Sequence, residues 1–268
     1  MERPSYIDWI IEETGITIKE GIPIKCYKIN YKEDEAIFDE WALHIRRNYI
    51  EDKDLLIDAK TNGMSIEQYL YEYVIPQRDE DLGPTVRSGD ITEIIVCDLL
   101  EFIFNYSVPR YKQKNRSGKN NSEHGTDVIG YKFFNESKKP NEEDELIATE
   151  VKAALTSKDF SPLENAIIES KKDEQRLART IDYCRKRLKE LGNLDQSNEV
   201  ARFLLKPDNN YKLTYAAAGF SSCQTVDKEI KLSASGEELQ ISSKQKIFYI
   251  HGKTLMDLTH KIYERCKK

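Results

Sequence analysis

Two short apolar segments with a polar stretch between them constrain the fold of this chain more than any other feature. Residues 125–131 and 146–153 are rich in small and β-branched side chains, whereas residues 135–145 are rich in charge and contain Asn and Pro. This pattern predicts two adjacent strands joined by a polar loop. Because side chains alternate between faces along a strand, Glu150 and Lys152 in the second strand point to the same side.

Asp127 lies in the first of these strands, so the sheet is expected to bring two carboxylates and a lysine together at one edge. Lone charges in apolar strands are costly unless they are paired or bind a cation. One or two carboxylates suffice to hold Mg²⁺, and such an ion activates water and stabilises charge on a phosphodiester. Asp127 and Glu150 are therefore candidate catalytic metal ligands, and Lys152 is a candidate catalytic residue that orients the water or offsets charge. The alternative is a structural salt-bridge network at the end of the sheet.

A strongly apolar helix is expected over residues 90–105. A helical wheel places Asp98 on its polar face and turns Glu93 about 140° away, toward buried side chains. A buried carboxylate needs a partner or a metal ion, so Glu93 is a candidate third metal ligand and catalytic acid. In the alternative, Glu93 only caps the helix start, three positions after Asp90.

Residues 110–120 contain five basic side chains and no acid. Lys112, Lys114 and Arg116 are candidate contacts to the DNA backbone, and a solvated face is the alternative. The whole chain carries a net charge of −6, whereas free-standing nucleic-acid binders are usually basic. An acidic protein with one basic run is typical of an enzyme that a partner brings to its substrate. His124, just before the first strand, is a candidate phosphate contact or a loop-shaping residue.

Hydrophobic periodicity and capping residues predict the remaining elements. Strands are expected over residues 16–31, 107–115, 211–221 and 247–252. Helices are expected over residues 34–50, 65–75, 162–191, 196–206 and 254–265, with loops over 77–90 and 226–244. The helix over 162–191 has a narrow apolar seam, which favours packing on the chain's own sheet over binding a partner.

These elements predict one α/β domain with a mixed β-sheet core flanked by helices. The core is expected over residues 87–192, with an N-terminal elaboration over 1–86 and a C-terminal α/β elaboration over 193–268. Five scattered cysteines without zinc-knuckle spacing predict reduced, mostly buried thiols. The chain has no apolar run of membrane-spanning length and no signal peptide, so we expect a cytoplasmic protein without a membrane partner.

The order of these motifs resembles the restriction-endonuclease-like, Asp…Glu-x-Lys nuclease superfamily. The resemblance is carried by Gly89-Asp90-x-x-Glu93, Val108-Pro109-Arg110, His124 to Gly130 and Thr149-Glu150-Val151-Lys152, within roughly residues 87–155. More narrowly, the chain resembles the HamA family, nuclease components of the bacterial Hachiman anti-phage defence system. One departure is that Ser107-Val108-Pro109 supplies no acid, which leaves the family's Asp to Asp127.

The resemblance implies a restriction-endonuclease-like fold and a Mg²⁺- or Mn²⁺-dependent DNase whose catalytic residues are Asp127, Glu150 and Lys152, with Glu93 as the helix acid. It also implies a HamB-like helicase partner that restrains the nuclease and releases it on damaged or phage-altered DNA. No small-molecule substrate is expected. Two alternatives stay open: a non-catalytic adaptor or regulatory subunit of a helicase complex, and a sensor that assembles through residues 162–191.

Overall fold

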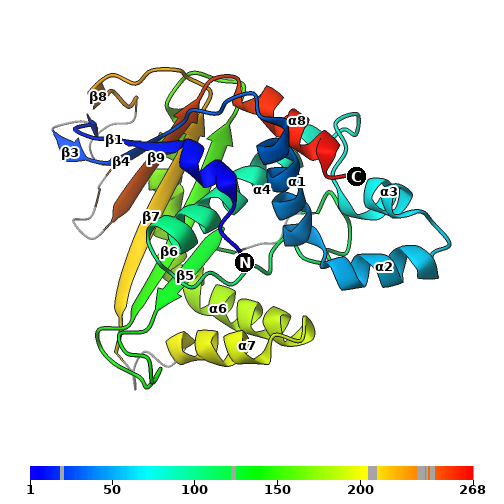
Figure 1. The fold of residues 1–268 in the computed structure, drawn as a ribbon. Coiled ribbons are helices and arrows are strands. Elements are labelled where there is room, and N and C mark those ends of the chain that lie inside the picture. The colour runs from blue at the N-terminus through cyan, green and yellow to red at the C-terminus, as the bar shows by residue number, and fades with distance from the viewer. Residues whose placement is uncertain are drawn as a thin grey trace.

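A six-stranded sheet forms the centre of the molecule and joins strands from the whole length of the chain (Figure 1). The computed structural model describes residues 1–18, 21–121, 125–204, 210–233, 239, 241 and 245–267, so the candidate residue His124 lies outside the described ranges. The strand order is β1-β4-β9-β7-β6-β5, in which the four inner strands are parallel and both edge strands are antiparallel to their neighbours. The expected mixed α/β sheet is thereby confirmed.

The strands of this sheet have the following bounds: β1 Ile10–Glu13, β4 Lys25–Ile29, β5 Val128–Lys132, β6 Glu145–Ala154, β7 Lys212–Ser221 and β9 Lys246–Gly252. A small second sheet has the order β3-β2-β8, with β2 at Thr17–Ile18, β3 at Ile22–Pro23 and β8 at Glu229–Ile230. The main sheet thus contains strands from each of the three expected segments of the chain, residues 1–86, 87–192 and 193–268. Of the expected irregular stretch 226–244, residues 234–238, 240 and 242–244 lie outside the described ranges.

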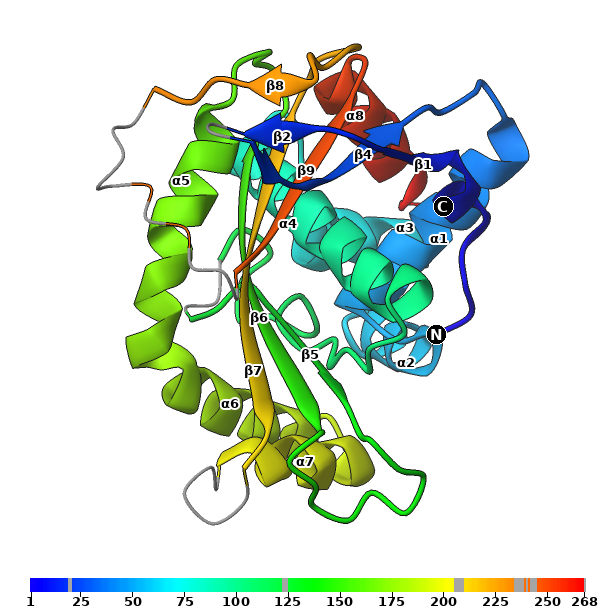
Figure 2. The same ribbon diagram turned by 90° about the vertical axis from the view of Figure 1, so that its left-hand side faces the viewer.

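Helices cover both faces of the sheet (Figure 2). The α-helices are α1 Glu35–Tyr49, α2 Asp52–Thr61, α3 Ile66–Tyr69, α4 Gly83–Asp98, α5 Ser161–Glu169, α6 Asp173–Glu190, α7 Leu194–Ala201 and α8 Leu255–Arg265. Shorter 3-10 or π-helical segments lie at Ser5–Trp9, Leu70–Val74, Leu99–Ile103, Ser170–Lys172 and Arg202–Leu204. Helices α1, α4 and α8 pack on one face over one apolar cluster, and α5, α6 and α7 pack on the other over two. Within the described ranges, every helix is too short or too polar to cross a membrane.

The helix that carries Glu93 starts earlier than predicted. It begins at Gly83 with Pro84 in its first turn, where the fixed φ of proline suits a helix and its missing N–H costs nothing. The second half of the expected loop over 77–90 is therefore helical. Asp90 and Glu93 both lie inside α4, so the interpretation of Glu93 as a cap of the helix start is wrong.

The prediction that Asp98 lies on the polar face of this helix is also wrong. Its carboxylate is completely buried. The hydroxyl of Tyr6 donates to it, Nε2 of His44 lies 3.0 Å from each of its oxygens, and the guanidinium of Arg110 donates at 2.5 Å. These partners come from segments distant in sequence, which a helical wheel does not see.

Residues 107–115 do not form the expected strand. Only Ser107 pairs with the sheet, through a single bridge to Tyr131 of β5, and Pro109 has no backbone N–H with which to continue a ladder. The rest of the segment crosses the molecule as an irregular loop. Its Lys112 side chain thereby reaches α4 and the start of β5, where it pairs with Glu93 and Asp127.

The predicted long helix over residues 162–191 is divided into α5 and α6 by the turn Ser170–Lys172. Helix α5 lies so close to β7 that a Cβ atom on Gly219 would come within 2.4 Å of Cα of Leu163. The apolar seam of α6 is buried against β5 and β6, so the predicted packing on the chain's own sheet is confirmed. The expected helices over 34–50, 65–75 and 254–265 and the strands over 211–221 and 247–252 are confirmed within a few residues.

Candidate functional site

The pairing of β5 with β6 positions Asp127. Val128 lies opposite Thr149 in the antiparallel ladder, so Asp127, one residue before β5, is level with Glu150. Oδ2 of Asp127 accepts a hydrogen bond from the backbone N–H of Val151 at 2.8 Å. This bond fixes the carboxylate of Asp127 against the middle of β6.

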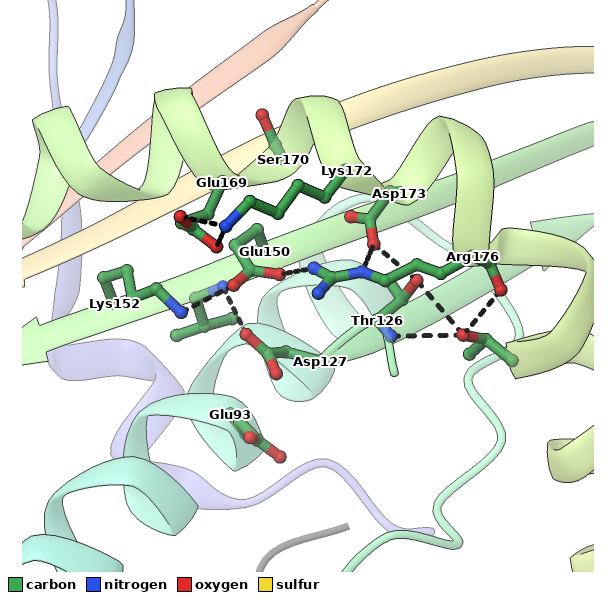
Figure 3. A network of polar contacts seen from close by, with 12 residues as sticks. Glu93, Thr126, Asp127, Glu150, Lys152, Glu169, Ser170, Lys172, Asp173 and Arg176 are labelled. Atoms are coloured by element: carbon green, nitrogen blue, oxygen red, sulfur yellow. Dashed lines mark hydrogen bonds and ion pairs between the residues drawn. The ribbon is translucent and has the colours of Figure 1, made fainter. Parts of the chain in front are cut away.

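Glu150 is the most deeply buried acid of the group, with only 3% of its side chain exposed. Nζ of Lys152 donates to its Oε1 at 2.6 Å, which confirms that the two side chains share a face. The guanidinium of Arg176, from the first turn of α6, donates to its Oε2 (Figure 3). Burial and the charge of Asp127 raise the pKa of Glu150, and Lys152 and Arg176 act in the opposite direction.

Glu93 reaches the same region from α4, on the other side of Asp127 from Glu150 (Figure 3). Nζ of Lys112 lies 3.3 Å from Oε1 of Glu93 and 3.2 Å from Oδ1 of Asp127, so one ammonium group bridges the two acids. Gln113 donates to Oε2 of Glu93 at 2.8 Å. Burial raises the pKa of Glu93 to about 7, which the charge of Lys112 opposes and that of Asp127 assists.

The three predicted DNA-contacting side chains are engaged inside the protein. The side chain of Lys112 is only 6% exposed. Arg116 donates to both carboxylate oxygens of Asp90, at 2.6 and 2.8 Å, and Lys114 pairs with Glu51. The expected exposed basic run is therefore a set of ion pairs with acids of the same chain, of which the Lys114–Glu51 pair lies at the surface. A contact of these cations with a DNA backbone requires them to leave their acidic partners.

Three further residues support the site and were not singled out from the sequence. The Thr126 hydroxyl donates to Oδ1 of Asp173 at 2.7 Å, and Nε of Arg176 donates to the same oxygen at 2.6 Å. Arg176 thus connects Asp173 to Glu150 (Figure 3). Thr126, the residue directly before Asp127, is bonded to α6 through Asp173. The spacing of Asp173 and Arg176, three apart at a helix start, was a visible signal, but nothing local pointed to Glu150.

The donor set of this site suits a hard divalent cation. Asp127 and Glu150 present carboxylate oxygens side by side, and two carboxylates with waters are enough for Mg²⁺ or Mn²⁺. The charge of Asp127 raises the pKa values of both Glu150 and Glu93, so positive charge among these acids is favourable. Oxygens of all three acids do not come within 4.8 Å of one another. The three acids therefore do not form a compact three-ligand set in this structure.

A family model described as HamA matches residues 4–266, which is nearly the full length. The match extends well beyond residues 87–155, the part on which the motif resemblance rests. No curated protein matches the chain.

Proposed function

We propose, given that this chain belongs to the HamA family, that it is a divalent-metal-dependent deoxyribonuclease with a restriction-endonuclease-like core. The family connects the chain to Hachiman antiviral defence. One observation carries the proposal of activity: Asp127 and Glu150 are level on paired strands, and Lys152 contacts Glu150 from the same strand face. This is the Asp…Glu-x-Lys arrangement in three dimensions.

In this proposal Asp127 and Glu150 hold Mg²⁺ or Mn²⁺, with Glu93 as a third acid on the α4 side. An ion held there would supply a nucleophilic water at neutral pH and would stabilise charge on the scissile phosphate. The hydrogen bond from Val151 N–H fixes the orientation of Asp127. Arg176 fixes that of Glu150 by donating to one oxygen, while Lys152 donates to the other.

Lys152 acts as a cation in this proposal. Burial lowers its pKa, but the hydrogen bond and charge of Glu150 and the charge of Asp127 outweigh burial and raise the pKa overall. Its ammonium group therefore stays protonated at neutral pH. We infer that Lys152 offsets charge on the phosphate or orients the water by donating a hydrogen bond, and that it does not remove a proton as a general base.

The family and the distribution of charge support the proposal of a helicase partner. The chain has a net charge of −6. The basic side chains of Lys112, Lys114 and Arg116 form ion pairs with acids of the same chain. We propose that DNA reaches the site through a HamB-like helicase, which also restrains the nuclease until it engages altered DNA. Tight DNA binding by the isolated chain at physiological salt would contradict this division of labour.

One observation favours the second candidate function, a non-catalytic adaptor of the helicase. Each of the three acids already has a basic partner, Lys112 for Glu93 and Asp127, and Lys152 with Arg176 for Glu150. A closed ion-pair network of this kind is stable without a metal ion.

Cleavage assays separate the two functions. Linear and circular DNA are incubated with the chain, alone and with its helicase partner and ATP, in Mg²⁺ and again with chelator. The nuclease predicts products that depend on Mg²⁺ and disappear with chelator. Intact DNA under every condition, with complex formation demonstrated, would favour the adaptor.

A further inference from the structure

A second cluster of metal-binding side chains lies on three adjacent strands of the main sheet, β1, β4 and β9 (Figure 1). Glu13 at the end of β1 pairs directly with Cys26 of β4. His251 of β9 lies opposite Lys28 of β4, two positions beyond Cys26. Because side chains alternate faces with a period of two, all three project from the same face of the sheet. This cluster shares no residue with the proposed nuclease site.

The ligand atoms of the cluster converge on one point. Nε2 of His251 lies 2.8 Å and Sγ of Cys26 lies 3.8 Å from Oε2 of Glu13, and all three atoms lie within 4.8 Å of one another. A tetrahedral zinc ion with bonds of about 2.0–2.3 Å holds its ligand atoms about 3.3–3.6 Å apart. The distances from Glu13 to His251 and from Glu13 to Cys26 are each within about 0.5 Å of this spacing. Among the described residues, these are the only three His, Cys, Asp or Glu side chains that meet so closely.

The orientation of the His251 ring requires a proton or a metal ion between Nε2 and Glu13. Nδ1 lies 2.9 Å from the backbone carbonyl oxygen of Cys223, and since a carbonyl only accepts, Nδ1 carries a proton and donates. In the neutral ring, Nε2 then has a lone pair that faces the carboxylate of Glu13. Two lone pairs at 2.8 Å repel each other unless a proton or a metal ion lies between them. A ring whose other nitrogen donates to a backbone carbonyl is the usual support of a metal-bound histidine.

A proton alone would make His251 a buried imidazolium paired with Glu13. Burial opposes that charge, but hydrogen bonds with Cys223, Cys26 and Glu13 raise the pKa of His251 to about 11. In this state the thiol of Cys26 contributes only a long hydrogen bond, with Sγ 3.8 Å from Oε2 of Glu13, whereas a bound metal ion would use all three groups as ligands. Thiolate, imidazole and carboxylate together are a ligand set typical of zinc.

We propose that Glu13, Cys26 and His251 bind one Zn²⁺ ion, which links the edge strand β1 to β4 and β9. Cys26 and His251 are fully buried, whereas 31% of the Glu13 side chain is exposed, so a water molecule supplies the fourth ligand from the Glu13 side. Sequence spacing does not reveal the site, because Glu13 and His251 are 238 positions apart.

The test uses the full chain without an affinity tag that binds metals. Zinc content is measured by mass spectrometry after purification, and the metal-free protein is then titrated with Co²⁺ and followed by absorbance. We expect about one tightly bound Zn²⁺ per chain and, with Co²⁺, a thiolate-to-cobalt charge-transfer band. Chelator should lower the melting temperature of the wild-type protein.

Cys26→Ser and His251→Gln should each reduce bound zinc to background, and Cys26→Ser should abolish the charge-transfer band. Cys184→Ser is the matched control, since Cys184 is equally buried but lies in α6, and it should leave zinc content and spectrum unchanged. Folded wild-type protein that gives no charge-transfer band, or a band that survives Cys26→Ser, would overturn the site. Neither readout involves DNA cleavage, so the result is independent of the nuclease proposal.

Discussion

Nζ of Lys112 lies 3.2 Å from Oδ1 of Asp127, inside the cluster of acids proposed as the nuclease centre. The same ammonium group contacts Glu93 at 3.3 Å. A residue expected to contact DNA at the surface is thus an internal counter-ion of the site. The charge of Lys112 offsets the repulsion between the carboxylates of Asp127 and Glu93. A divalent cation bound to these carboxylates would have to share them with Lys112.

Replacing Lys112 with Met removes this charge and keeps most of the side-chain volume. Both acids then lack their nearest cation, and removing one partner of a buried ion pair typically costs about 3–5 kcal/mol. We expect a loss of that order in the free energy of unfolding, measured by urea denaturation without divalent metal. Lys189→Met, at an exposed position of α6, is the control and should change stability by less than about 0.5 kcal/mol. Equal stability of the two variants would show that Lys112 is not an essential counter-ion.

Glu93 predicts a pH dependence of stability. Its pKa is raised to about 7 in the folded protein, above the usual value of 4.5, so between these pH values the folded state binds more protons than the unfolded state. This group therefore stabilises the fold below about pH 4.5, and its contribution is lost as pH rises toward 7. Glu93→Gln should flatten the stability profile in this window, by up to about 1.4 kcal/mol per pH unit.

The measurement compares urea denaturation of wild type and Glu93→Gln at intervals from pH 4.5 to pH 7.5. The variant should gain stability relative to wild type as pH rises. Glu190→Gln, at an exposed position at the end of α6, controls for the loss of one carboxylate. Parallel profiles for wild type and Glu93→Gln would exclude a raised pKa at Glu93.

Arg176 is a positioning residue in the proposed mechanism, because it contacts Glu150 and Asp173. Arg176→Met should reduce cleavage about 10–100-fold, the usual effect of removing a group that orients a metal ligand. The Mg²⁺ concentration for half-maximal cleavage should rise while DNA affinity stays the same, and Arg176→Lys should recover part of the loss. Arg179→Met, one turn along α6 and exposed, should cleave like wild type. A purely structural role would lower stability without moving the Mg²⁺ dependence.

The packing of α5 on β7 depends on Gly219. A methyl group there would lie 2.4 Å from Cα and 2.6 Å from N of Leu163, which are backbone atoms that cannot turn away. Gly219→Ala should therefore destabilise the protein by about 1–3 kcal/mol, measured by thermal or urea unfolding. Gly89→Ala in α4 is the control: nothing lies within 4 Å of the added methyl, and alanine favours the helix by about 1 kcal/mol.

The parts of the fold that sequence predicted are those whose signals are local. The hairpin of β5 and β6 follows from two apolar segments around a polar loop, and it alone sets Asp127 level with Glu150. Helix α1 follows from its apolar spacing and from Asp34, whose carboxylate accepts hydrogen bonds from the N–H groups of Ala36 and Ile37. In these segments, short-range periodicity and tertiary packing agree.

The errors arose where distant parts of the chain decide the environment. The helical wheel places Asp98 on a polar face, but in the folded protein its carboxylate is buried among Tyr6, His44 and Arg110. The burial of Lys112 depends on two acids, on α4 and at the start of β5, that spacing does not place opposite it. The spacing of Arg176 and Asp173 predicts their ion pair within α6, but it does not predict the contact of Arg176 with Glu150. Such pairings become apparent only when the sheet and both helix layers are assembled.

Loss of cleavage by two conservative variants of the central pair tests the proposed activity most directly. Wild-type chain, Glu150→Gln and Lys152→Met are each combined with the helicase partner, ATP, DNA and Mg²⁺, after folding and complex formation are verified. Glu169→Gln, in α5 with its own partner Lys172, serves as the control. The proposal predicts Mg²⁺-dependent cleavage by wild type and control, and a loss of at least about 100-fold in both site variants. Cleavage that persists in Glu150→Gln and Lys152→Met would contradict the assignment of the site.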